Sequence, residues 1–166
     1  MNKKIIFLVI LIVFINNNIF SQTFYKSSKY NYSIEIPENY YKNSNTGNID
    51  MNYYDLNGSS VNIVVVERDF STSTPHDLQL STFENLFKNY DKNVKVYGEE
   101  KITINNKKAY KFKRFITFTG SSKLYQLSYT FYDNTYQYII TFSCGSDLYL
   151  DYEKTFEGIA ATMKFN

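Results

Sequence analysis

The chain has 166 residues, with 18 basic and 16 acidic side chains, one cysteine and one histidine. Removal of an N-terminal export signal that contains Lys3 and Lys4 would balance the charges at 16 against 16, which argues against a general nucleic-acid binder. A single cysteine excludes a disulfide framework within the chain and a cysteine-rich metal site. The remaining length of about 145 residues is typical of one domain that buries its own core.

The N-terminal segment has the three parts of a secretory signal peptide. A basic start at residues 1–4 precedes an apolar run at residues 5–15, and three asparagines separate that run from the small residue Ser21. The run is shorter than the roughly 20 apolar residues that a membrane-spanning helix needs. We therefore predict a cleaved signal at residues 1–21 and a single exported domain at residues 22–166, periplasmic or secreted, with no transmembrane segment in the mature chain.

The first half of the mature chain predicts three strands. Apolar residues alternate with polar ones over residues 30–36, which indicates a half-buried strand that ends at Pro37. Residues 38–48 are polar and predict a loop. A weaker strand at residues 51–54 and an apolar strand at residues 61–67 follow, joined at Asn57–Gly58, a pair typical of a type I′ hairpin turn.

The second half predicts two helices and a four-stranded meander. Thr74, Pro75 and Asp77 are suited to the start of a first helix at about residues 74–90. Ser146 is suited to cap the last helix, whose apolar stripe contains Tyr152, Phe156, Ile159, Ala160 and Met163. The four strands expected between these helices lie at about residues 94–104, 109–119, 124–132 and 135–143.

Two-residue turns within the meander would fix which side chains share a face. Turns at Ser121–Ser122 and Asp133–Asn134 place Phe131 between Phe112 and Tyr136, on one aromatic face. The other face would then be mostly polar. We expect the helices to cover the aromatic face and to leave the polar face open to solvent.

The order of these elements resembles the PsbP-like fold, including the DcrB-like exported proteins. The segments that carry the resemblance are residues 30–37, 61–67, a helix with Phe83 and Leu86, and residues 100–111, 124–127, 136–142, 152–159 and 163–165. The chain departs from the pattern where Glu38 follows Pro37, because relatives often carry Gly-Trp there, and where Asn105–Asn106 replaces a hairpin glycine. The resemblance implies an α+β domain, a mainly antiparallel sheet of about six or seven strands flanked by helices, and a non-enzymatic accessory or binding role.

The residue types offer little evidence for catalysis. His76 has no nucleophile pattern around it, and Cys144 is expected to be a small buried side chain rather than a reactive thiol. Asp50 and Asp55, with Asn52 and Asn57, carry calcium-type oxygen ligands, but their spacing is not that of an EF-hand. We expect no cofactor and no metal. A hydrolase that uses a carboxylate pair is a remaining alternative.

The densest positive charge lies at residues 107–114. It is either a strand face that points its lysines into solvent, which discourages aggregation through the strand edge, or a surface that binds an anionic ligand or partner. Lys111 and Lys113 alternate on one strand, and the expected register places Gln126 beside them on the polar face. We predict that these three residues contact any ligand, which would be a small anionic or polyhydroxyl molecule or an envelope protein. The leading function is therefore an exported, non-enzymatic binding or accessory module, and the alternative is a structural subunit of an envelope assembly.

Overall fold

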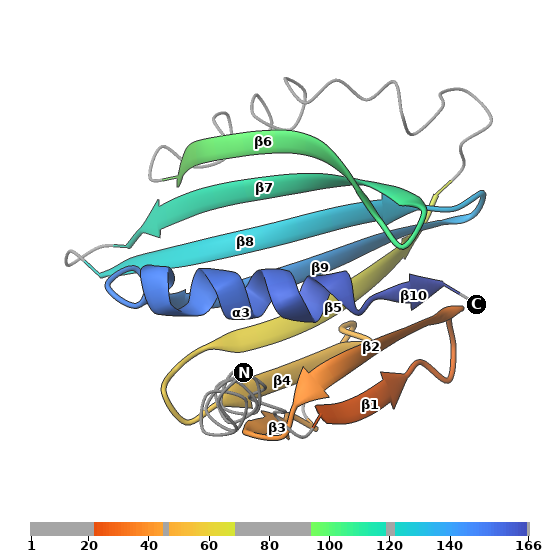
Figure 1. The fold of residues 1–166 in the computed structure, drawn as a ribbon, viewed down its shortest axis with the longest axis horizontal. Coiled ribbons are helices and arrows are strands. Elements are labelled where there is room, and N and C mark those ends of the chain that lie inside the picture. Colours follow the sequence, from red (N-terminus) through yellow and green to blue (C-terminus); the bar gives the residue numbers. More distant parts are fainter. Residues whose placement is uncertain (1–21, 45–46, 69–93, 119–121, 166) are drawn as a thin grey trace, which may run out of the picture.

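The computed structural model describes residues 22–44, 47–68, 94–118 and 122–165, and it contains two antiparallel sheets and a helix (Figure 1). The larger sheet has seven strands in the order β3-β4-β5-β9-β8-β7-β6, and the smaller has three in the order β1-β2-β10. The bounds of the elements are β1 Gln22–Lys26, β2 Tyr32–Pro37, β3 Tyr40–Lys42, β4 Met51–Asp55, β5 Ser60–Glu67, β6 Val94–Ile104, β7 Lys107–Thr117, β8 Lys123–Tyr132, β9 Tyr136–Gly145, α3 Tyr149–Ala161 and β10 Lys164–Phe165.

This arrangement confirms the predicted α+β class with a mainly antiparallel sheet. The meander β6-β7-β8-β9 and the strands β2, β4 and β5 lie where the sequence predicted them, within a few residues. The short strands β1, β3 and β10 were missed, and β3 falls in the segment predicted to be a loop. The signal segment, the first predicted helix and His76 lie outside the described residues.

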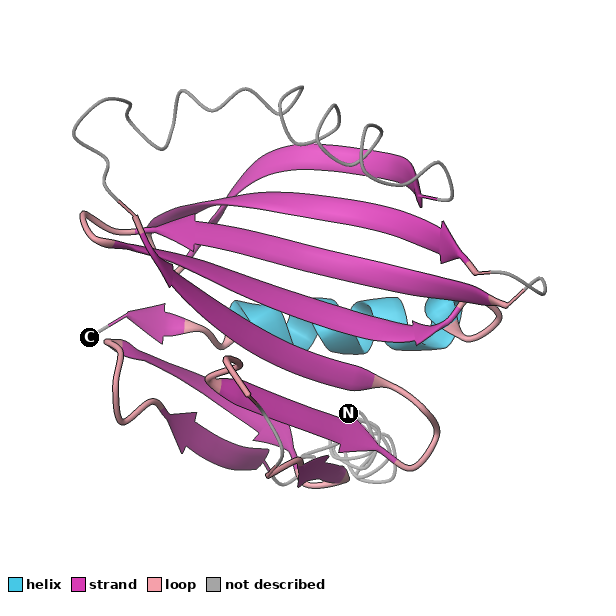
Figure 2. Ribbon diagram, turned by 180° about the vertical axis from the view of Figure 1, so that it is seen from behind, coloured by secondary structure: helices cyan, strands magenta, loops and turns pink. Residues whose placement is uncertain are grey.

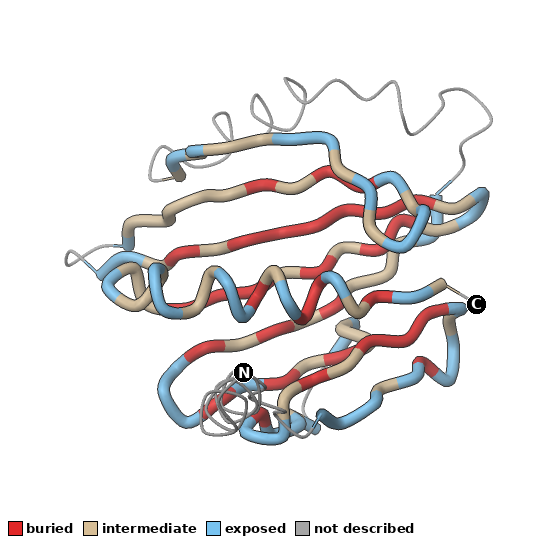
Figure 3. The backbone as a smooth tube through the Cα atoms, viewed as in Figure 1, coloured by how far each residue is buried: buried red, intermediate tan, exposed pale blue. Residues whose placement is uncertain are grey.

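One face of the large sheet carries the hydrophobic core. Helix α3 and the small sheet both pack against it, and the buried residues follow β8, β9, β2 and β4 (Figure 3). The rings of Phe142 and Phe156 stack with centroids 5.1 Å apart, which joins β9 to α3. Tyr32 of β2 meets Tyr138 of β9 edge to face, with centroids 5.9 Å apart. Cys144 lies in this core, and its burial confirms the prediction for the only cysteine.

The predicted register between β7 and β8 is wrong by three residues. Phe115, rather than Phe118, pairs with Tyr125, and Phe112 pairs with Ser128. The physical reason is the length of the connection: the strands part after Thr117, and the Phe118 N–H donates to the carbonyl of Ser122 across a longer loop. A shift by an odd number of residues exchanges the two faces of a strand.

The predicted register between β8 and β9 is wrong by two residues, which leaves the faces unchanged. Phe131 pairs with Tyr138 rather than Tyr136. The Asp133 carboxylate accepts the backbone N–H groups of Thr135 and Tyr136 and so holds a wider turn than the two-residue one expected. Phe131 therefore lies on the core face as predicted.

The second face of the large sheet, seen in Figure 2, is not the open polar surface that the sequence suggested. Ser128, Thr130 and Gln137 are buried there, together with Phe112. The expected solvent exposure of these polar side chains is therefore wrong.

Two turns and one helix start also differ from expectation. At Asn57–Gly58 only Gly58 has positive φ, at 89°, so this is not a type I′ turn. Asn105 and Asn106 have φ of 46° and 64°, and they form the tight β6-β7 turn instead. Ser146 does not cap α3, whose N-cap is Leu148 without a side-chain hydrogen bond.

A groove between β6, β7 and the start of helix α3

Helix α3 contacts β7 through three pairs of residues. Lys111 pairs with Glu157, Lys113 pairs with Glu153, and the ring of Phe115 meets that of Tyr149 with centroids 5.4 Å apart. Residues two apart on a strand are separated by about 6.6 Å, and residues four apart on a helix by about 6 Å. Because these spacings nearly match, an antiparallel helix and strand can hold three consecutive contacts, which we call the three helix–strand pairs.

Lys111 is the most enclosed charge of this set. Its side chain is 12% exposed, and its Nζ lies 2.7 Å from a Glu157 oxygen and 2.9 Å from a Glu100 oxygen on β6. Burial acts to lower the pKa of Lys111, but the hydrogen bonds that it donates to Glu157 and Glu100 outweigh burial and raise that pKa. The hydrogen bond from Lys111 in turn lowers the pKa of Glu100. Lys111 therefore ties the edge strand β6 to helix α3.

A β-bulge in β6 presents Tyr97 next to these pairs. Val96 pairs with Arg114 and Gly98 pairs with Lys113, so Tyr97 is the extra residue of the bulge. Tyr97 is 59% exposed, and its ring meets the ring of Phe115 edge to face, with centroids 5.0 Å apart. The ammonium of Lys95 lies 4.8 Å from the centre of the Tyr97 ring.

Strands β6, β7 and β8 and the start of α3 line an open groove of about 610 Å³. Its aromatic part consists of four rings in successive contact, and Phe115 and Tyr125 have centroids 5.2 Å apart. Burial is the main cause that raises the pKa of the Tyr125 phenol, and the charge of Glu153 is the second. The phenol therefore stays neutral. The groove is lined by Lys95, Tyr97, Lys113, Phe115, Thr117, Lys123, Tyr125, Ser146, Tyr149 and Glu153.

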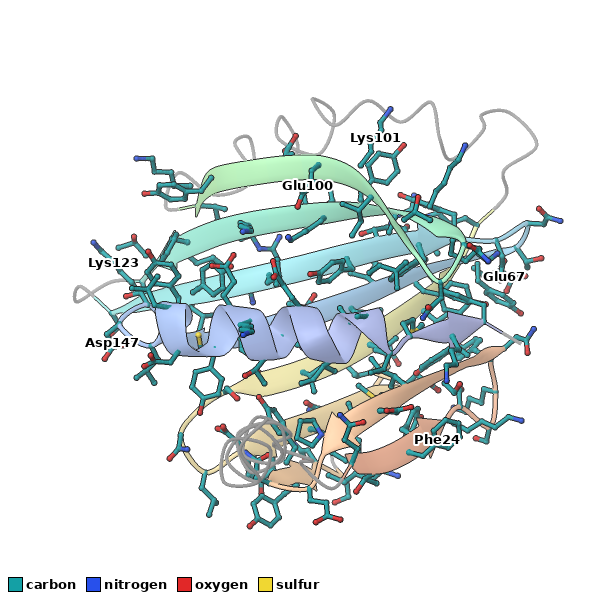
Figure 4. All side chains as sticks on the ribbon, in the orientation of Figure 1. Phe24, Glu67, Glu100, Lys101, Lys123 and Asp147 are labelled. Carbon is teal, nitrogen blue, oxygen red and sulfur yellow. The ribbon has the colours of Figure 1, made fainter. Side chains whose placement is uncertain are left out.

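The lysines of the groove differ in how they are neutralised. Lys113 pairs with Glu153, whereas Lys95 and Lys123 have no carboxylate within 4 Å among the described residues. Figure 4 places Lys123 at the end of the sheet, next to the segment that leads into α3. The groove therefore combines an aromatic floor with two exposed positive charges that are available to a ligand.

The three predicted binding residues do not lie together. Lys111 and Lys113 face α3, but Gln126 lies on the opposite face of the sheet, where it accepts a hydrogen bond from Arg114 and donates one to Ser143. The prediction that the three residues share a polar face is therefore wrong, because the register between β7 and β8 differs by three residues from the expected one. Only Lys113 of the three lines the large groove, and Lys111 lines a smaller depression of about 230 Å³ beside it.

Sequence reasoning missed the aromatic residues of the groove. Tyr97, Tyr125 and Tyr149 each appeared as ordinary strand or helix tyrosines, because nothing local marks the long loop after Thr117. Two signals were available. An isolated glycine inside a strand suggests a bulge, and Gly98 directly follows Tyr97. The spacings also match: residues 111, 113 and 115 are two apart on a strand, and residues 157, 153 and 149 are four apart on a helix.

The other candidate residues take structural roles. Asp50 accepts a hydrogen bond of 2.5 Å from the Tyr32 hydroxyl, and Asp55 accepts one of the same length from Tyr152. Asp133 accepts a hydrogen bond from Tyr138 at 2.6 Å. The described residues contain no group of three or more His, Cys, Asp or Glu side chains that could hold a metal ion.

The architecture defines the class of the protein as an antiparallel α+β sandwich. Comparison with solved structures then identifies the fold within this class. The chain is similar to cyanobacterial PsbP (CyanoP) from Synechocystis sp. PCC 6803, with a TM-score of 0.71 and 14% identity over 91% of this chain and 96% of that one. The protein has a PsbP-like fold, as its sequence had suggested. No protein-family model matches the sequence, and no curated protein is significantly similar to it.

Two further solved structures share the fold at lower similarity. LpqN of Mycobacterium tuberculosis, described as involved in cell envelope biogenesis, has a TM-score of 0.58 and 10% identity over 91% of this chain and 87% of that one. The Ran-binding protein Mog1p of Saccharomyces cerevisiae also has a TM-score of 0.58, with 6% identity over 88% of this chain and 96% of that one. At these identities the likeness concerns the fold alone. Among the described residues of this chain, no helix is long and apolar enough to cross a membrane.

Proposed function

We propose that the protein is an exported, non-enzymatic binding module of the cell envelope, and that it binds through the groove beside α3. The observation that carries this proposal is the combination of four contacting aromatic rings with two exposed lysines, Lys95 and Lys123, that have no carboxylate partner among the described residues. Rings offer contact area, and unpaired ammonium groups offer charge to an incoming ligand.

The state of the carboxylates supports binding rather than hydrolysis. A general acid of the glycosidase type needs a raised pKa, whereas the hydrogen bond from Lys111 lowers the pKa of Glu100. Glu153 and Glu157 hold the two lysines of β7, and Asp55 holds the Tyr152 hydroxyl. These carboxylates are committed to contacts that stabilise the fold.

Two observations support an envelope role. The first 21 residues have the basic start, short apolar centre and small exit residue of an export signal. Among proteins of this fold, LpqN is described as involved in cell envelope biogenesis. Mog1p is described as Ran-binding, which supports a binding role for this fold.

Fractionation of cells that produce the full chain tests export. We expect a mature protein that lacks the signal peptide and begins near Gln22. N-terminal sequencing identifies its first residue. A chain that keeps Met1 and stays in the membrane fraction would contradict export.

Affinity capture from the native envelope tests binding, with bound proteins and small molecules both identified. Tyr97→Ser combined with Lys123→Ser should abolish capture. The matched control is Tyr54→Ser combined with Lys42→Ser, which changes an exposed tyrosine and an exposed lysine away from the groove. Equal capture by both double variants would exclude the groove, and conversion of the captured molecule by the purified protein would contradict a non-enzymatic role.

A further inference from the structure

We propose that the ligand of this groove is an acidic carbohydrate, which places a sugar ring on the aromatic floor and an anionic substituent between Lys95 and Lys123. This inference rests on the proposed function and specifies the chemistry of its ligand. It follows from three properties of the lining: the exposed ring of Tyr97 beside the half-buried rings of Phe115 and Tyr149, neighbouring hydroxyl groups, and positive charge that is not neutralised.

The rings suit the flat C–H faces of a sugar. Tyr97 is 59% exposed although it belongs to a strand, and its position as the extra residue of the bulge directs it to the groove. Tyr149 meets both Phe115 and Tyr125, with centroids 5.4 and 5.3 Å apart, and these contacts hold the rings in place before a ligand arrives. A floor that is ordered in advance lowers the entropic cost of binding.

The hydroxyl groups suit a ligand that is rich in hydroxyls of its own. Thr117 and Ser146 line the groove beside the phenols of Tyr97 and Tyr149, and a hydroxyl can both donate and accept a hydrogen bond. An acyl chain or an apolar peptide side chain would leave these groups without partners at a cost in free energy. The lining therefore favours a polyhydroxyl ligand over a lipid chain or an apolar peptide.

The charges specify an acidic sugar rather than a neutral one. Glu153 neutralises Lys113, so the charge available to a ligand comes from Lys95 and Lys123, which both line the groove. Lys95 stays beside the Tyr97 ring, at 4.8 Å from its centre, and so remains near any sugar on the floor. A carboxylate, sulfate ester or phosphate ester on the sugar is the complement of these two ammonium groups.

Calorimetry with the purified exported protein tests the proposal with two acidic oligosaccharides and one neutral one. The probes are digalacturonate, a sulfated heparin disaccharide and the uncharged galactobiose. At least one acidic probe should bind, with an affinity that falls as salt rises, and galactobiose should bind much more weakly. Failure of both acidic probes to bind, or equal binding of galactobiose, would overturn the proposal.

Charge-matched variants locate the binding. Lys95→Gln with Lys123→Gln should weaken binding of the acidic probe about tenfold, whereas Lys42→Gln with Lys154→Gln, which removes the same charge from exposed sites elsewhere, should leave it unchanged. Both double variants should keep the wild-type unfolding midpoint, because all four lysines are exposed. Equal weakening by the two pairs would show that net charge alone attracts the probe, and would overturn the site.

Two other ligand classes are controls in the same experiment. Binding of a hexaglutamate peptide or of phosphatidylglycerol vesicles at the groove, with neither acidic oligosaccharide bound, would replace the carbohydrate by a peptide or a membrane surface and overturn the inference. The proposed function has a separate outcome. If native capture still depends on Tyr97 and Lys123 while no acidic sugar binds, the protein is a binding module for another ligand.

Discussion

Two neighbouring stripes of helix α3 contact the same sheet in different ways. The apolar stripe, with Phe156, Ile159 and Ala160, is buried in the core. The paired stripe, with Tyr149, Glu153 and Glu157, contacts β7 through the three helix–strand pairs and borders the groove. The difference teaches that the apolar stripe joins α3 to the core of the sheet, whereas the paired stripe joins α3 to the strands at its edge and borders a surface available for binding.

The largest test of this comparison removes a ring from the apolar stripe. Phe156→Ala should lower the free energy of unfolding by about 3 to 5 kcal/mol, because Phe156 is fully buried against Phe142. Thr155→Ala, at an exposed position next to it, is the control and should change stability by less than about 0.5 kcal/mol. Chemical denaturation measures both, and similar midpoints for the two variants would contradict the assignment of the core stripe.

The second test removes the lysine of β7 that pairs with Glu157 of the paired stripe. Lys111→Met should cost about 2 kcal/mol, because it leaves Glu100 and Glu157 without their shared partner. Lys113→Met should cost less, because Lys113 is 35% exposed and pairs with Glu153 alone. Denaturation curves that show a larger loss for Lys113→Met would reverse the ranking of the two pairs.

The third test concerns the C-terminal end of the helix, where the two stripes end. The Asn105 side-chain amide donates to the carbonyls of Ala161 and Met163 at 2.9 and 2.7 Å. Asn105→Gly keeps the left-handed turn but removes these bonds, and should cost about 1 kcal/mol. Asn106→Gly is the matched control, since it keeps the same turn and all of these bonds. Hydrogen exchange at residues 159–163 should quicken only in the first variant.

The smallest effect is the pH dependence of Glu100. Its folded pKa is lowered below the ordinary value of 4.5, so its contribution to stability is present above about pH 4.5 and is lost as the pH falls through the folded pKa. Wild type and Glu100→Gln should therefore differ at pH 7 and converge as the pH falls through the folded pKa of Glu100. The difference is small because Glu100 is 54% exposed. A difference that grows toward acid would contradict the sign.

The contrast between the two stripes also explains what the sequence could reveal. Helical periodicity predicted a stripe of Tyr152, Phe156, Ile159, Ala160 and Met163. The last four are buried, and Tyr152 is half-buried at the edge of the core. Periodicity was sufficient because burial of an apolar stripe depends only on local spacing.

The paired stripe could not be predicted in the same way. It depends on which face of β7 meets the helix, and this is decided by the length of the loop after Thr117, whose composition does not specify it. A two-residue turn would place Lys111 on one face of the sheet, whereas the longer loop that is observed places it on the other face. The groove was hidden for the same reason, because Phe115 and Tyr125 become neighbours only in the observed register.

The small sheet has a consequence for the order in which the chain can fold. Strand β2 pairs with β1, which precedes it directly, and with β10, which contains Phe165 near the end of the chain. The Phe165 ring also packs on Tyr138 and Phe131, with centroids 5.0 and 5.2 Å apart. Because one edge of β2 pairs with a strand that is synthesised much later, a chain that emerges N-terminus first can complete this sheet only once β10 has emerged.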